Sequence, residues 1–303
     1  MFKQIILGVG NNSLVSRTIQ QYGMQMGAAR FVAGSTLAQA IAAVKELNER
    51  GIAATLDHLG ESVTRIEEAQ AARNSYLAML DAIAKEQVRS HVSLKLTMMG
   101  LAISEEACLG NLLEILDRAH QYGNFVRIDM EDSHFTAATL NMFQKAWDKY
   151  PENVGVVLQA YLYRTMEDLN SLSQPPKNFR IVKGAYQEPA SLAYPSKPDV
   201  DDNYVALVQA SLQHGNFTAV ASHDEVVLGK VVRFLESQHI PQSQVEFQML
   251  YGVKLSVLED LARRGFAARV YVPWGRDWYA YYLRRIAERP ANLLFFARSL
   301  AKR

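Results

Sequence analysis

The chain has 303 residues, of which 49% are hydrophobic and 21% charged, the balance of a soluble globular protein rather than a disordered chain. Its 32 basic and 31 acidic side chains are scattered and leave a net charge of +1, which argues against a nucleic-acid partner. The single cysteine, Cys108, cannot form an intramolecular disulfide, and no stretch is long and uncharged enough to span a bilayer. We therefore expect a cytoplasmic protein.

The first fifty residues predict helices, because Phe31, Ile41, Val44 and Leu47 recur at helical spacing before Gly51. We expect residues 1–50 to form helices that pack on a single catalytic domain, residues 51–303.

From residue 52 onward, short apolar runs alternate with longer amphipathic stretches, as in a parallel sheet with crossover helices. The predicted strands cover 52–57, 91–96, 125–129, 154–159, 179–183, 217–222, 245–249 and 268–272. The predicted helices cover 62–86, 105–122, 134–150, 163–172, 200–214, 225–238, 254–264 and 277–302. Eight of each favour an α/β fold closed as a (βα)8 barrel over a doubly wound sheet, whose usual G-x-G-x-x-G turn is missing. The proline-rich loop 188–201 is a candidate lid.

Polar residues follow each predicted strand, where barrel enzymes place their chemistry. The first five strands end in TLDHLGE, SLKLTMMG, VRIDMEDS, LQAYLYRT and RIVKGAYQ. The last three end in VASHD, FQMLYG and VYVPWGRDWY. We therefore expect an active site at the carboxyl-terminal mouth of the barrel.

Lys95 lies inside a strand pattern, where a buried ammonium group needs a partner. It is either a site lysine or one that extends out of the strand end into solvent. Asp129 ends the next strand and can pair with it, although such a pair can also be purely structural. Glu61 alone reads as a first-turn helix residue that complements the helix dipole.

Tyr281, Arg284 and Arg285 share one face of the last helix and can present two guanidinium groups to a carboxylate. The alternative is a solvated face on which Arg284 pairs with Glu288. Tyr271 and Trp274 favour the pocket, because aromatic rings there can cover a small apolar ligand.

The histidines lack metal-ligand spacing, so no metal site is expected. His223, at the sixth strand end, is a site residue or a hydrogen-bonded structural one. No phosphate-binding loop of the G-x-x-x-x-G-K-[ST] type is present.

Taken together, the strand-end segments and the final PWGRDWYAYYLRRIAERP resemble those of monofunctional bacterial proline dehydrogenases over nearly the whole chain. The resemblance implies a distorted barrel that holds FAD non-covalently and oxidises L-proline to Δ1-pyrroline-5-carboxylate. Ser222, where threonine is expected, and Ser35, where relatives often have glutamate, depart from the pattern.

The resemblance also assigns roles to individual residues. Arg284 and Arg285 would bind the proline carboxylate, and Glu61 would pair with Arg284 to close the site. The remaining substrate residues would be Lys95, Leu250, Tyr271 and Tyr281, with Asp129 beside Lys95. The flavin would contact Gln159, Arg180, Val182, Lys183, Gly184, Ala185, Ser222, His223 and Gln248, with Arg180 near flavin N5.

The resemblance further implies a membrane quinone as electron acceptor and a separate pyrroline-5-carboxylate dehydrogenase downstream. The segment ANLLFFARSLAKR combines apolar and basic residues that can lie on the inner face of a membrane, although a helix packed on the barrel is favoured. Two rival hypotheses keep the barrel without flavin. One uses Lys95 or Lys183 as a Schiff-base nucleophile, and the other is a non-catalytic amino-acid sensor.

Overall fold

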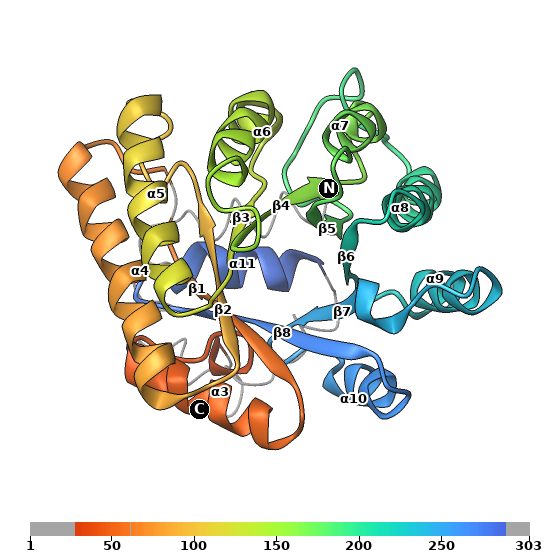
Figure 1. The fold of residues 1–303 in the computed structure, drawn as a ribbon, viewed down its shortest axis with the longest axis horizontal. Coiled ribbons are helices and arrows are strands. Elements are labelled where there is room, and N and C mark those ends of the chain that lie inside the picture. The colour runs from red at the N-terminus through yellow and green to blue at the C-terminus, as the bar shows by residue number, and fades with distance from the viewer. Residues whose placement is uncertain (1–27, 61, 289–303) are drawn as a thin grey trace.

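Eight parallel strands close into a barrel in sequence order, with β1 paired to both β2 and β8 (Figure 1). The computed structural model describes residues 28–60 and 62–288. The strands are β1 (Ala53–His58), β2 (Ser90–Lys95), β3 (Val126–Asp129), β4 (Val154–Gln159), β5 (Asn178–Val182), β6 (Phe217–Ala221), β7 (Val245–Leu250) and β8 (Ala267–Trp274). The predicted barrel is confirmed, and every strand boundary lies within two residues of its expected place.

Helices surround the barrel between successive strands. They are α4 (Ile66–Glu86), α5 (Glu105–Gln121), α6 (Ser133–Trp147), α7 (Thr165–Leu172), α8 (Lys197–Gln213), α9 (Glu225–Ser237) and α10 (Leu255–Arg263). The 3-10 turns η1 (Ala28–Arg30) and η2 (Gln242–Gln244) precede α3 and β7. Two further helices, α3 (Leu37–Glu49) and α11 (Trp278–Glu288), take places that a regular barrel does not give them.

Helix α3 precedes β1 yet packs against both β1 and β8, the place that the helix after β8 takes in a regular barrel. A reciprocal capping box starts α3, in which Gln39 N–H donates to Thr36 Oγ1 and Thr36 N–H donates to Gln39 Oε1. Gly51, at φ +79°, turns the chain into β1. Of the N-terminal segment expected to form helices, α3 lies within the described ranges, whereas residues 1–27 lie outside them.

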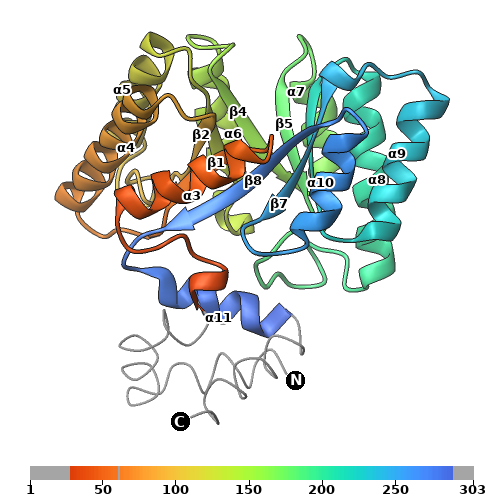
Figure 2. The same cartoon turned by 90° about the horizontal axis from the view of Figure 1, so that it is seen from below.

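Helix α11 lies across the carboxyl-terminal end of the barrel rather than in its outer ring (Figures 1 and 2). With α3 filling the gap between β8 and β1, the last helix is displaced onto the barrel mouth. There Tyr282 and Trp278 pack against Phe31 and Val32 from the segment before α3. The expected continuation of this helix to residue 302 lies outside the described residues.

The amino-terminal half of the barrel interior holds a polar network instead of apolar layers. Arg269 Nε donates to Glu246 Oε1 at 2.8 Å, and Gln248 Nε2 donates to the same oxygen at 2.6 Å. Arg127 donates to the Asn178 carbonyl at 2.8 Å. These charges are buried but partnered, as burial of charge requires.

The loop between β5 and α8 ends before residue 201, where the expected lid ends, because α8 begins at Lys197. Ser196 caps α8 and Pro198 occupies its first turn, where the missing proline N–H costs no helical hydrogen bond. The Leu192 carbonyl accepts from Tyr163 N–H at 3.1 Å, and Tyr194 N–H donates to the Tyr161 carbonyl at 2.8 Å. The loop is thus attached to the connection between β4 and α7.

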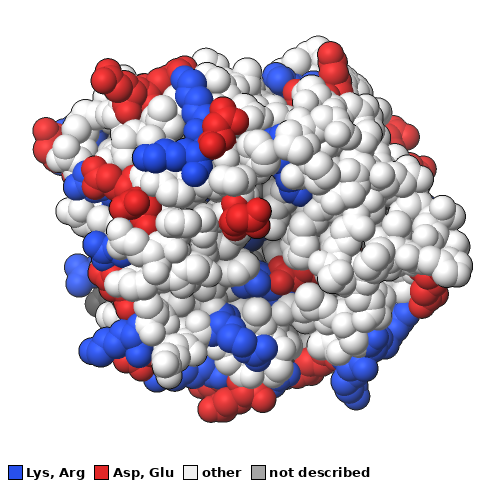
Figure 3. All heavy atoms as spheres, viewed as in Figure 1, with Lys and Arg blue, Asp and Glu red and all other residues white. Residues whose placement is uncertain are grey.

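Acidic and basic side chains are interspersed on the face drawn in Figure 3, in keeping with the nearly neutral net charge. Within residues 28–60 and 62–288, no helix has the length and apolar character needed to cross a bilayer.

Candidate active site

Asp129, at the end of β3, is the centre of a buried hydrogen-bond network. Its Oδ1 accepts from Ser93 Oγ at 2.7 Å and from Arg180 at 2.9 Å, and its Oδ2 accepts from the Tyr271 hydroxyl at 2.8 Å. The Arg180 guanidinium carbon lies 5.4 Å from the Tyr271 ring centroid, within cation–π range. Burial raises the pKa of Tyr271, so its phenol stays a neutral donor. Four strands, β2, β3, β5 and β8, contribute to this network.

Lys95 pairs with Asp57 and not with Asp129, which corrects the pairing expected from the sequence. Its Nζ lies 3.6 Å from Asp57 Oδ2, although Lys95 and Asp129 are register partners on neighbouring strands. Asp129 instead faces Arg180, whose planar guanidinium offers several donors to a carboxylate.

Asp57 is a site residue that the sequence analysis missed. Its side chain is 2% exposed on β1, and burial raises the pKa of its carboxyl group while the Lys95 charge opposes that rise. The Tyr76 hydroxyl donates to the Ser93 carbonyl at 2.8 Å and lies 3.4 Å from Asp57 Oδ1. The available signal was a charged residue inside an apolar strand run, the same signal that singled out Lys95.

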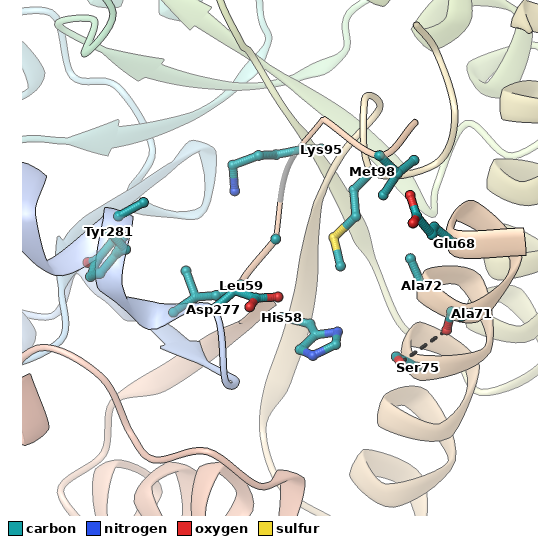
Figure 4. Close-up of a pocket in the computed structure, with 13 residues that line it drawn as sticks. His58, Leu59, Glu68, Ala71, Ala72, Ser75, Lys95, Met98, Asp277 and Tyr281 are labelled. Carbon is teal, nitrogen blue, oxygen red and sulfur yellow. Dashed lines mark hydrogen bonds between the residues drawn. The ribbon is translucent and has the colours of Figure 1, made fainter. Parts of the chain in front are cut away.

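A cavity of about 480 Å³ lies between the ends of β1 and β2, the start of α4 and the start of α11 (Figure 4). Lys95 and Tyr281 line it from opposite elements, so the fold brings together two predicted substrate residues. The other lining residues are His58, Leu59, Gly60, Val63, Glu68, Ala71, Ala72, Ser75, Met98, Asp277 and Ala280. His58, not singled out from the sequence, stacks on Trp274 with ring centroids 4.5 Å apart, and burial lowers its pKa.

Arg285 lies beside Tyr281 on α11, as their spacing predicts. The guanidinium carbon of Arg285 is 5.2 Å from the Tyr281 ring centroid, and Tyr281 is buried. The side chain of Arg284 and the whole of Glu61 lie outside the described residues, so the expected Arg284–Glu61 gate and the alternative Arg284–Glu288 pair are not described.

The predicted flavin residues gather at the ends of β4 to β7. Gln159 Nε2 donates to the Glu131 carbonyl at 2.7 Å, and Gln248 Nε2 donates to Glu246. His223 Nε2 accepts from the Leu250 N–H at 2.9 Å, so the other ring nitrogen carries the proton in the neutral tautomer. These contacts fix the orientation of three side chains beside Leu250 at the barrel mouth.

The segment after β5 is fixed by charge and by close packing. Lys183 bridges Asp201 and Asp224, and Lys197 bridges the same two carboxylates. Gly184 has φ +113°, and a Cβ there would lie 2.2 Å from the Tyr161 ring.

The remaining predicted flavin residues lie around this segment. Val182 is the last residue of β5, Ala185 is exposed, and Ser222 is buried just after β6 with its hydroxyl accepting from Asp224 N–H at 3.2 Å.

The remaining candidates from the sequence are the lone cysteine, a metal site and a Schiff-base lysine. Cys108 is buried, with its thiol 3.5 Å from the Leu96 carbonyl, as expected for a structural cysteine. Among the described residues, no group of three His, Cys, Asp or Glu side chains is placed to hold a metal ion. Both lysines of the Schiff-base hypothesis form ion pairs, Lys95 with Asp57 and Lys183 with Asp201.

Known proteins share both the sequence and the fold of the chain. The family model described as proline dehydrogenase matches residues 40–298. Proline dehydrogenase 1 of Bacillus subtilis (strain 168) is 41% identical over the full length of both chains, and proline dehydrogenase of Deinococcus radiodurans is 40% identical over 100% of this chain and 98% of its own. The solved proline utilization A (PutA) of Bdellovibrio bacteriovorus superposes with a TM-score of 0.83 at 25% identity. That match covers 95% of this chain but only 36% of the PutA chain, so the chain spans about a third of that protein. With its barrel and its sequence in agreement, the chain belongs to the proline dehydrogenase family.

Proposed function

We propose that this protein is an FAD-dependent proline dehydrogenase that oxidises L-proline to Δ1-pyrroline-5-carboxylate, the first step of proline catabolism to glutamate. The family membership supports the substrate and the reaction class. The observation that carries the proposal is the cavity in which Lys95 of β2 meets Tyr281 of α11, with Arg285 beside Tyr281. A volume of about 480 Å³ suits a small ligand.

The last helix would bind the substrate carboxylate. Arg285 presents a guanidinium fork next to the Tyr281 ring, so charge and apolar cover lie on the same helix face. Arg284 is proposed to act with Arg285, and Glu61 to pair with Arg284 over the bound substrate. Tyr271 and Leu250 would contact the proline ring from the ends of β8 and β7. A fixed carboxylate orients the ring, which is the main contribution a protein makes to hydride transfer.

The residues at the ends of β4 to β7 fit a flavin. Arg180 Nε is buried without a hydrogen-bond partner in the described part of the chain, so a donor is available close to Tyr271. Gln159 and Gln248 donate from their amide nitrogens to Glu131 and Glu246, which leaves their amide oxygens as acceptors. The flavin set comprises Gln159, Arg180, Val182, Lys183, Gly184, Ala185, Ser222, His223 and Gln248. When bound, FAD would supply the acceptor for the hydride from proline C5.

The partners of the reaction follow from this assignment. Electrons are proposed to pass to a membrane quinone, and the product to leave for a separate pyrroline-5-carboxylate dehydrogenase. The segment ANLLFFARSLAKR, outside the described residues, is the proposed contact with the inner face of the membrane. Residues 51–303 are proposed as the catalytic domain.

The absorbance spectrum tests the function directly. The purified protein should be yellow, and anaerobic L-proline should bleach it with formation of pyrroline-5-carboxylate, identified by mass spectrometry. A colourless protein, or one that proline does not bleach, would refute the proposal.

The role of Arg285 is tested by R285M. This variant should retain flavin but need a much higher proline concentration, by roughly 10- to 100-fold or more for loss of a charge-assisted pair. The matched control is R264M, which removes an exposed arginine paired with Glu236 on the outer ring. An unchanged proline dependence in R285M would exclude the proposed role of Arg285 in binding the substrate carboxylate.

A further inference from the structure

Resting on the proposed function, we propose that Asp57 receives, through Lys95, the proton that the amine of the substrate must lose before its oxidation. Asp57 is thus a positioning residue that acts through Lys95. The two residues form a proton relay from the cavity into the barrel wall.

The geometry supplies both ends of this relay. Lys95 lines the cavity, so its ammonium group is placed to meet a ligand there (Figure 4). Behind it, Asp57 Oδ2 lies 3.6 Å from Lys95 Nζ and has no hydrogen-bond partner among the described residues. The Lys95 ammonium is therefore the charged group that faces this buried oxygen, and a buried carboxylate takes up a proton more readily than an exposed one.

The groups around Asp57 support a carboxyl group that can take up a proton. Burial of Asp57 raises the pKa of its carboxyl group, and the negative charge of Asp129 on β3 raises it further. Lys95, the Tyr271 hydroxyl of β8 and His58 on β1 act in the opposite direction. Tyr76 of α4 lies 3.4 Å from Oδ1, which leaves Oδ2 as the oxygen facing Lys95.

The proton balance closes within the pair. One N–H bond of the Lys95 ammonium breaks first as Asp57 Oδ2–H forms, which leaves a lone pair on Nζ. That lone pair then takes a proton from the substrate ammonium group, whose N–H bond breaks. The amine becomes neutral, Lys95 remains an ammonium ion, and Asp57 becomes a carboxylic acid. The nitrogen lone pair is then available when the hydride leaves C5. No oxidant is needed beyond the flavin of the proposed function.

His58 is the competing acceptor, because it lines the same cavity and its Nδ1 has no partner in the described structure. Its ring is stacked on Trp274, and within the described part of the chain it forms no ion pair or hydrogen bond with Lys95 or Asp57. The ion pair therefore favours Asp57.

The experiment measures the rate of anaerobic flavin bleaching at saturating L-proline as a function of pH. In the wild type the rate should fall as pH drops through the pKa of Asp57, since a protonated carboxyl group cannot accept. D57N should be slower by about 10²- to 10⁴-fold near neutral pH, the usual contribution of a positioned acid or base. The rate of D57N should increase with pH, because Lys95 must first lose a proton to solvent. The fall in rate at low pH, called here the acid limb of the pH profile, therefore lies at higher pH in D57N than in the wild type.

Two controls separate this role from a structural one. E246Q removes another buried carboxylate from an ion pair, at the amino-terminal half of the barrel, and should keep the acid limb at its wild-type position. H58F should also keep it. A second readout is the infrared difference spectrum of a single turnover, in which the wild type should gain a carboxylic-acid carbonyl band that D57N lacks.

The outcomes are distinct. A D57N profile that superimposes on the wild type after scaling, or an acid limb lost only in H58F, overturns the relay. Wild-type protein that proline does not bleach refutes the proposed function itself.

Discussion

Replacing Asp129 with asparagine should destabilise the barrel strongly, because it removes the charge opposite a buried arginine. Asp129 accepts hydrogen bonds from Ser93, Arg180 and Tyr271, and the Arg180 side chain is only 5% exposed. Removing one partner of a buried ion pair costs about 3–5 kcal/mol. At ~2.1 cal/mol/K of unfolding entropy per residue, a chain of 303 residues has roughly 0.6 kcal/mol/K, so the melting temperature should fall by about 5–8 °C.

Thermal and chemical denaturation of the purified chain measure this effect. The matched control is D168N, which breaks the partly exposed Arg164–Asp168 pair on α7 and should cost about 1 kcal/mol or less. Removing both charges in D129L/R180M should give a chain more stable than D129N, since no buried charge is then left unpaired. If D129N is as stable as D168N, or D129L/R180M is less stable than D129N, the buried-charge reasoning is wrong.

Two further positions give independent predictions. G184A should lower the unfolding free energy by about 1–3 kcal/mol for backbone strain at φ +113°, and by roughly another 1–3 kcal/mol for the Cβ contact with Tyr161. The control is G110A on α5, where a Cβ meets nothing within 4 Å, and this variant should be neutral or stabilising. Equal stability of the two variants would contradict the packing argument. Hydrogen bonds from Lys197 and Lys183 lower the pKa of Asp224 below 3.8, so its contribution is present above that pH and lost below it. The difference in unfolding free energy between wild type and D224N should therefore shrink on acidification. A difference that grows would refute the predicted direction of this pH dependence.

Local pattern was enough to predict the strands and the barrel. A buried parallel strand needs a short apolar run, and a crossover helix needs an amphipathic one. Both patterns depend only on residues close together in the sequence. The place of α11 at the barrel mouth also followed from Tyr281 and Arg285 once the family resemblance gave them a role.

The proline-rich segment 188–201 shows where local pattern misplaces a boundary between loop and helix. Its prolines suggested a loop, but Pro198 occupies the first turn of α8, where proline is compatible with a helix. The bonds that hold the rest of the loop join it to residues about 30 positions earlier in the chain, such as Leu192 to Tyr163. Such contacts leave no trace in the loop's own sequence.

The sequence by itself determined which residues stand at the strand ends and therefore which can reach the mouth. Only the tertiary structure decided the pairing, because side chains from strands that are not neighbours in sequence meet inside the closed barrel. Asp129 pairs with Arg180, two strands away, and Lys95 pairs with Asp57 of the preceding strand. The choice depends on how the side chains converge inside a closed barrel, where partners are set by burial and donor geometry rather than by distance along the chain. The buried Asp57, absent from the predicted site, entered it for that reason.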